Sequence, residues 1–190
     1  MCPYPSAAAT HPGRLRRGGR GRMFACVGDA RPGDCMKARM DFRKASPPAA
    51  KAIADLHAYV HRCGLEHALL ELVKLRASQL NGCAHCIDMH TKELRADGES
   101  EQRLYLLDAW RESPFYSERE RAALAWTEAL TLVTDGHVPD DAYAAARAQF
   151  SEEELVNLSV AIVAINGANR LNIAFRTVPG SYRAKVRAAE

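Results

Sequence analysis

The sequence predicts an all-α protein, and three observations support this prediction. From Ser46 onward, apolar residues recur at spacings of three and four, which is the period of an amphipathic helix. Ser117 and Ser151 are each followed three residues later by glutamate, a capping-box pattern in which the serine oxygen and the glutamate satisfy each other's free backbone donors. No segment shows a convincing strand or hairpin pattern. We therefore expect a compact bundle of about six to seven helices.

The first three helices are expected between residues 46 and 96. The first begins with a serine and two prolines, which is typical of an N-cap with proline in the first turn, and it ends at Gly64. The second carries an apolar stripe over residues 69–80 and stops at an Asn-Gly pair, a strong turn signal. The third begins at Cys83, so a Cys-x-x-Cys pair is expected at the start of a central helix.

Four further helices complete the expected bundle. Their predicted first residues are all of types that are common at helix N-termini: Ser100, Ser117, Pro139 and Ser151. The last of the four is the longest and ends before the Pro-Gly pair at residues 179–180.

Length and composition are those of one globular domain. The chain has 190 residues, too few for a comfortable two-domain enzyme. Hydrophobic residues make up 47% and charged residues 26%, which excludes general disorder and a coiled-coil rod. No stretch reaches the roughly 18 apolar residues of a membrane span, so we expect no membrane association.

Residues 1–35 are expected to form a disordered extension, and the helical domain is expected over residues 36–190. The extension is rich in Arg, Gly, Pro and Ala and has no apolar period. It contains six arginines and two acids, so the body of the protein is nearly neutral and has no predicted nucleic-acid surface. Two interpretations stay open, a transit peptide and an over-long gene start with Met23, Met36 or Met40 as later initiation sites. A secretory apolar segment is missing, so we expect the reducing cytoplasm.

The chemistry concentrates at the start of the third helix. At about 100° per residue, Cys83, Cys86 and His90 fall within about a 60° arc of one helical face, whereas His85 lies on the far side. The two thiols can close a disulfide, and the imidazole can exchange a proton with them. The helix start favours a thiolate at Cys83. If the second and third helices form a hairpin, Glu71 lies beside His90 and its carboxylate could orient the imidazole and relay a proton.

Other uses of the cysteine pair are weighed against this redox constellation. Haem attachment is excluded because Ile87 stands where a histidine would have to follow the second cysteine. Zinc could use Cys83, Cys86 and His90, with Glu71 or water as the fourth ligand, although no second Cys-x-x-Cys exists. Two buried cysteines could also pack as small hydrophobic residues, but this does not explain why His90 shares their face.

Several other polar residues are interpreted as structural. His57 and His61 have a spacing that can bind metal, but without a carboxylate pattern beside them a solvated or capping role is favoured. Cys63 lies on the apolar stripe of the first helix. Three amides recur every third residue on the last helix and could fix a helix crossing or an interface, and we do not predict them to be catalytic: Asn166, Asn169 and Asn172.

The spacing of the site residues resembles a known signature. The run from Glu71 to His90, with eleven residues before Cys-x-His-Cys and three after it, is similar to that of alkyl hydroperoxidase D-like proteins in the carboxymuconolactone decarboxylase superfamily. The resemblance covers about residues 40–178. A tryptophan would be expected at Ala168, and this departure would alter a pocket wall without touching the thiols.

The resemblance implies a thiol-dependent peroxidase that reduces organic hydroperoxides. Cys86 would attack the terminal peroxide oxygen and become a sulfenic acid, which Cys83 would capture as a disulfide. Glu71 and His90 would form the proton relay, with His85 in a supporting role. The helix-start argument instead favours Cys83 as the more acidic thiol, and here we follow the resemblance.

The resemblance also bears on partners. The reaction needs no metal, haem or other cofactor, but a lipoyl-bearing or thioredoxin-like reductant would have to reopen the disulfide. Relatives of this kind are homo-oligomers, so a trimer or hexamer is expected. The decarboxylase branch lacks the cysteine pair, which disfavours a lactone decarboxylase. A disulfide reductase and a redox sensor remain as alternatives.

Overall fold

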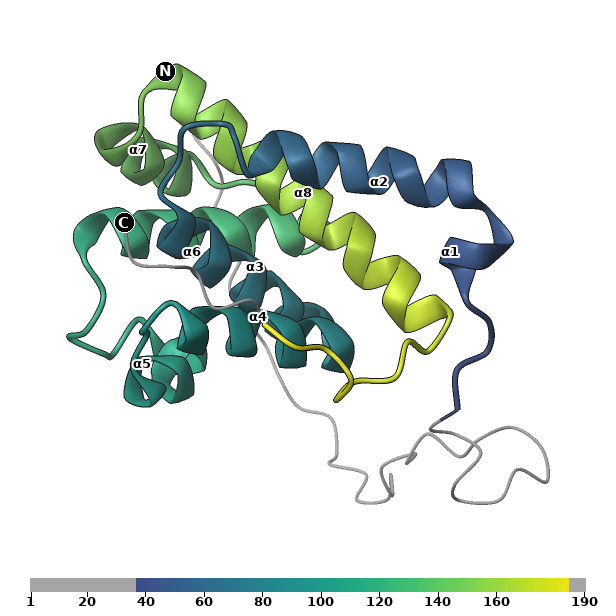
Figure 1. Cartoon of the computed structure of the whole chain (residues 1–190). Coiled ribbons are helices and arrows are strands. Elements are labelled where there is room, and N and C mark those ends of the chain that lie inside the picture. Colours follow the sequence, from purple (N-terminus) through teal and green to yellow (C-terminus); the bar gives the residue numbers. More distant parts are fainter. Residues whose placement is uncertain (1–36, 185–190) are drawn as a thin grey trace, which may run out of the picture. The chain divides into compact units, whose positions relative to one another are not determined.

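The computed structural model describes residues 37–184, and the expected extension over residues 1–35 lies outside this part of the chain. The described part forms eight α-helices and one short 3-10 helix and contains no strand, so the all-α prediction is confirmed (Figure 1). The helices are α1 (Phe42–Ala45), α2 (Pro47–Val60), α3 (His67–Asn81), α4 (Ala84–Ala96), α5 (Glu101–Leu106), α6 (Glu118–Thr131), α7 (Asp140–Gln149) and α8 (Glu152–Ala174), with the 3-10 helix at Leu107–Ala109. None of them has the length and apolar character that crossing a membrane requires.

Seven of these α-helices correspond to the expected segments. Both capping boxes are present. The side chains of Ser117 and Ser151 each accept a hydrogen bond from the backbone N–H of the glutamate three residues later, and the carboxylate of that glutamate accepts one from the backbone N–H of the serine. Ser46 precedes α2 as expected, but its side chain makes no capping hydrogen bond. The additional helix, α1, is one turn capped by Asp41, too short for its period to be recognised in the sequence.

Helix α3 lies at the centre of the bundle. It packs against α4, α6 and α8, and every residue from Leu69 to Ser78 is buried. Figure 1 shows α2 and α8 crossing over one side of the bundle, with α3 and α4 beneath them. The buried run includes the charged residues Glu71, Lys74 and Arg76, and each of these needs a partner inside the protein.

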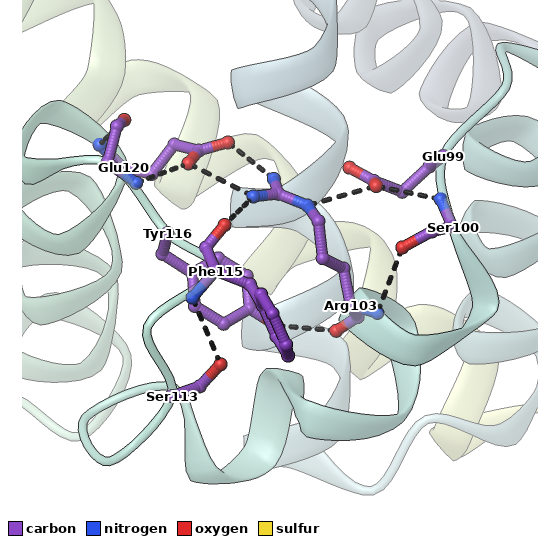
Figure 2. Close-up of polar contacts among 8 residues, drawn as sticks. Glu99, Ser100, Arg103, Ser113, Phe115, Tyr116 and Glu120 are labelled. Carbon is purple, nitrogen blue, oxygen red and sulfur yellow. Dashed lines mark hydrogen bonds and ion pairs between the residues drawn. The ribbon is translucent and has the colours of Figure 1, made fainter.

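Hydrogen bonds from Arg103 connect α5 to the start of α6 (Figure 2). Its Nε donates to Glu99 at 2.9 Å, its Nη2 donates to Glu120 at 2.6 Å, and a further N–H donates to the carbonyl of Phe115. The hydroxyl of Tyr116 donates in turn to the Arg103 carbonyl. Because Glu120 also closes the capping box of α6, this network fixes where α6 begins. Tyr116 also belongs to an apolar cluster that includes Leu94 of α4.

Candidate active site

The turn between α3 and α4 places both site cysteines at the N-terminus of α4. Gly82 ends α3 with a φ of 67°, a left-handed conformation that glycine adopts without strain, and Cys83 is the N-cap of α4. The two sulfur atoms of Cys83 and Cys86 are free thiols 2.7 Å apart. A disulfide bond is about 2.05 Å long, so only a small movement separates the dithiol from its oxidised form.

The thiol of Cys83 is the more acidic of the two. When it is ionised, the Cys86 thiol donates to its sulfur, and this bond lowers the pKa of Cys83 to about 7. Burial opposes the shift, while the backbone N–H of Cys86 and the Asn169 amide reinforce it. The same shared proton, together with burial, raises the pKa of Cys86. The pair therefore loses its first proton near neutral pH, and the helix start contributes to this only through the backbone N–H groups of His85 and Cys86.

A cavity of about 740 Å³ opens beside Cys86. Helices α1, α2, α3, α4 and α8 form its walls together with Tyr182, and of the two site cysteines only Cys86 lines it. Much of the remaining wall is apolar: Ile53, Ala54, Met89, Ile165, Ala168 and Leu171. Ala168, where the resemblance would lead one to expect tryptophan, therefore leaves space in the pocket. A small apolar molecule that enters the cavity meets Cys86 before it meets Cys83.

A buried charge array lies against the cavity. The two carboxylate oxygens of Glu71 bond to different partners, Oε1 to the ammonium of Lys74 and Oε2 to Nδ1 of His90, each at 2.7 Å. All three residues are at least 96% buried. Burial alone would raise the pKa of Glu71, but the hydrogen bond from His90 and the electrostatic effects of His90 and of the Lys74 ammonium hold it well below its usual range. Glu71 is therefore a fixed anion, as the expected pairing with His90 requires.

His90 presents its other ring nitrogen without a partner. In the neutral ring that donates from Nδ1 to Glu71, Nε2 carries a lone pair, and no described residue forms a hydrogen bond with this atom. His90 lies one helical turn beyond Cys86 and lines the same cavity. The lone pair can therefore take a proton from a thiol or return one to a molecule in the cavity.

Two site residues were missed in the sequence. Lys74 is 1% exposed and completes the array with Glu71. The sequence feature that could have indicated this contact is its position three residues after Glu71, in a helix that has no polar face. Asn172 donates from Nδ2 to the sulfur of Cys86 at 3.4 Å. Its neighbour Asn169 bonds Ser78 and Asn81 and so joins α8 to α3, as a residue that fixes a helix crossing should. The contact of Asn172 with a site cysteine was not anticipated when the three amides were interpreted as fixing a helix crossing or an interface.

Other histidines line the cavity without joining the array: His57, His61, His67 and His85. The ring of His85 lies 3.4 Å from the Val178 carbonyl, and only its backbone N–H bears on Cys83. His57 and His61, interpreted above as solvated or capping, also line the cavity, and burial and the nearby Lys74 charge lower the pKa of His57 to about 4. Within residues 37–184, no group of three or more His, Cys, Asp or Glu side chains could hold a metal ion.

Comparison with known sequences places this site within a known family. Residues 47–129 match the carboxymuconolactone decarboxylase family. The uncharacterized protein YdfG of Bacillus subtilis is 42% identical over 139 residues, which cover 73% of this chain and 95% of that protein. The family match over residues 47–129 includes both the cysteine pair and Glu71.

Solved structures share the fold. A protein of unknown function from Agrobacterium tumefaciens, provisionally described as the antioxidant defence protein AhpD, is 51% identical with a TM-score of 0.75, covering 77% of this chain and 100% of that one. The alkylhydroperoxidase AhpD core of an uncharacterized peroxidase-related protein from Ralstonia eutropha is 17% identical with a TM-score of 0.65, covering 74% of this chain and 75% of that one. The second likeness extends to the fold alone.

Proposed function

The chain belongs to the carboxymuconolactone decarboxylase family, and from this membership and the dithiol beside the cavity we propose that it is a thiol-dependent peroxidase of organic hydroperoxides. One observation carries the proposal: Cys86 lines an apolar cavity, 2.7 Å from the sulfur of Cys83. The proposed catalytic residues are Cys86, Cys83 and His90, with Glu71 as the group that orients the imidazole.

Activation begins with the loss of one proton from the dithiol. The lone pair on Nε2 of His90 accepts this proton, and the resulting imidazolium is stabilised by the Glu71 carboxylate. The anion is favoured on Cys83, but the remaining proton needs to cross only the short gap between the sulfurs to leave the charge on Cys86. This transfer reconciles an acidic Cys83 with attack by Cys86, the thiol that faces the cavity.

The chemical steps balance without a metal or an organic cofactor. The Cys86 thiolate forms a bond to the terminal peroxide oxygen, the O–O bond breaks, and the leaving alkoxide takes the proton from His90. The Cys83 thiol then displaces the hydroxyl group of the sulfenic acid, which leaves as water as the disulfide forms. One hydroperoxide is reduced to an alcohol, and two thiols are oxidised. Two electrons from a reductant must then reopen the disulfide.

The burial of the sulfur atoms supports a slender reductant. Cys83 and Cys86 are 1% and 0% exposed, so a thiol held on a flat protein surface would not reach them. A lipoyl group on its flexible arm could enter the cavity, which favours the lipoyl-bearing alternative over a thioredoxin-like protein. The apolar side chains of Val156 and Val163, seven residues apart on α8 and each 62% exposed, support the proposed homo-oligomer.

Peroxide should oxidise this pair first. After sub-stoichiometric organic hydroperoxide and thiol blocking at quench, the tryptic peptide Ala77–Lys92 should lose about two mass units, the two hydrogens of an internal disulfide. Met89 in the same peptide should remain unoxidised, and Cys63 should remain open to alkylation as a control. Two alkylated thiols in this peptide after exposure would remove the basis of the proposal.

The reaction should accelerate as the pH rises through about 7. Below this value both thiols hold their protons, and above it the pair carries the negative charge that attack requires, because the pKa of Cys83 is about 7. Single-turnover oxidation measured across this range should give one ionisation. In Cys83→Ser the transition should move to higher pH, because burial raises the pKa of the remaining Cys86 thiol. A rate that does not change with pH would contradict the shared-proton mechanism.

A further inference from the structure

The amide of Asn172 bridges the attacking sulfur and the cavity. Asn172 lies in the last turn of α8 and is 5% exposed. Its Nδ2 donates to Cys86 at 3.4 Å, and its Oδ1 has no hydrogen-bond partner among the described residues. Both Asn172 and Cys86 line the cavity. The N–H group of the amide therefore bonds the thiol, and its carbonyl oxygen has no partner among the described residues.

An unpaired buried carbonyl oxygen calls for a donor. Leaving such an acceptor without a hydrogen bond is costly, and the other unpaired atom on the cavity wall at this place is Nε2 of His90, which is also an acceptor in the unprotonated ring. A ligand that satisfies this site must therefore bring a hydrogen-bond donor close to Cys86. The rest of that ligand must suit the apolar wall formed by residues such as Ile165 and Leu171.

We propose that Asn172 forms the seat for the hydroperoxyl group, an inference that rests on the proposed function. The O–H of the substrate donates to Oδ1 of Asn172, which places the terminal oxygen against the sulfur of Cys86. The N–H of the same amide stabilises negative charge on that sulfur, so that the shared proton can move to Cys83. Asn172 thereby selects both the oxygen that is attacked and the thiol that attacks it.

The two halves of the amide can be tested with two variants and a matched control. Asn172→Leu removes both polar atoms, whereas Asn172→Asp keeps acceptor oxygens but loses the N–H donor. Asn157→Leu is the control, because Asn157 is another buried amide of α8 at 5% exposure, but it bonds Tyr59 and the Cys63 carbonyl away from the thiols. Thermal melting of all three variants reports any general loss of packing.

The first readout needs no peroxide. In the reduced protein, mass spectrometry can resolve iodoacetamide alkylation at Cys86, which lines the cavity, from alkylation at Cys83. The Cys86:Cys83 ratio should fall by about tenfold or more in both Asn172 variants, since a hydrogen bond to a charged group is lost. It should stay unchanged in Asn157→Leu. An unchanged ratio in both Asn172 variants would overturn the inference.

The second readout is turnover of tert-butyl hydroperoxide with a small dithiol reductant. Asn172→Leu should raise KM and lower kcat, whereas Asn172→Asp should lower kcat with KM close to that of the wild type, because the acceptor remains. Equal KM values in the wild type and Asn172→Leu would overturn the seat for the hydroperoxyl group. If the wild type consumes no hydroperoxide, both the proposed function and the binding of a hydroperoxyl group by Asn172 are contradicted. The alkylation ratio still decides whether Asn172 activates Cys86.

Discussion

Replacing Cys86 with serine is expected to lower hydroperoxide turnover by at least about a thousandfold, to the background rate. A serine hydroxyl does not ionise near neutral pH, so no sulfenic acid can form at this residue and no disulfide can form with Cys83. Serine and cysteine side chains have nearly the same size, so the substitution should leave no large cavity and should change the thermal stability little. Loss of cumene hydroperoxide in the presence of a dithiol reductant measures the effect.

Two further cysteine variants separate the roles of the thiols. In Cys83→Ser, each chain should reduce about one hydroperoxide and then stop, leaving a sulfenic acid on Cys86 that a dimedone-type reagent can trap. Cys63→Ser should keep nearly full activity, because Cys63 is half-buried against the apolar core and is not among the cavity residues. If the single reduction occurred in Cys86→Ser and not in Cys83→Ser, the two roles would be exchanged.

The helices could be predicted closely because the signals that start and stop them are local. A capping box needs only a serine and a glutamate three residues apart, so the starts at Ser117 and Ser151 follow directly from the chain. The end of α3 was equally clear, since a glycine is needed for its left-handed turn. Helix α1 was missed because one turn held by Asp41 leaves no period to detect.

The site contacts that are local in sequence could also be predicted, whereas the distant ones could not. Cys86 and His90 lie within α4 and Cys83 is its N-cap, so their proximity follows from local spacing alone. The contact of His90 with Glu71 needed only the assumption of a hairpin between neighbouring helices. Asn172 reaches Cys86 across 86 positions of sequence, and nothing local distinguishes its amide from those that only join helices.

Lys74 was missed for a different reason, and its discovery changes what is expected of Glu71. A helix buried on every side has no polar face, so the period of α3 does not say whether a lysine points to water or into the core. The structure places it against Glu71, which makes Glu71 a structural counter-ion as well as the partner of His90. A variant of Glu71 should therefore affect stability and activity together.

Glu71→Gln is expected to cost about 3–5 kcal/mol of unfolding free energy, because it leaves the ammonium of Lys74 buried without a counter-ion. It should also slow single-turnover oxidation, since the His90 imidazolium loses the charge that stabilises it. Urea unfolding monitored by circular dichroism measures the first effect, and stopped-flow oxidation measures the second. An unfolding free energy equal to that of the wild type would show that the ion pair is dispensable.

The double variant Glu71→Gln with Lys74→Met separates the two effects. Replacing a buried ion pair by uncharged groups of similar size is often neutral for stability, so most of the lost unfolding free energy should return. The oxidation rate should remain low, because His90 still lacks its carboxylate partner. If the rate recovered together with stability, the slow oxidation of the single variant would be a consequence of poor folding, and Glu71 would have no role in the chemistry. Recovery of stability alone would assign the Glu71 carboxylate to both tasks and Lys74 to the structural one.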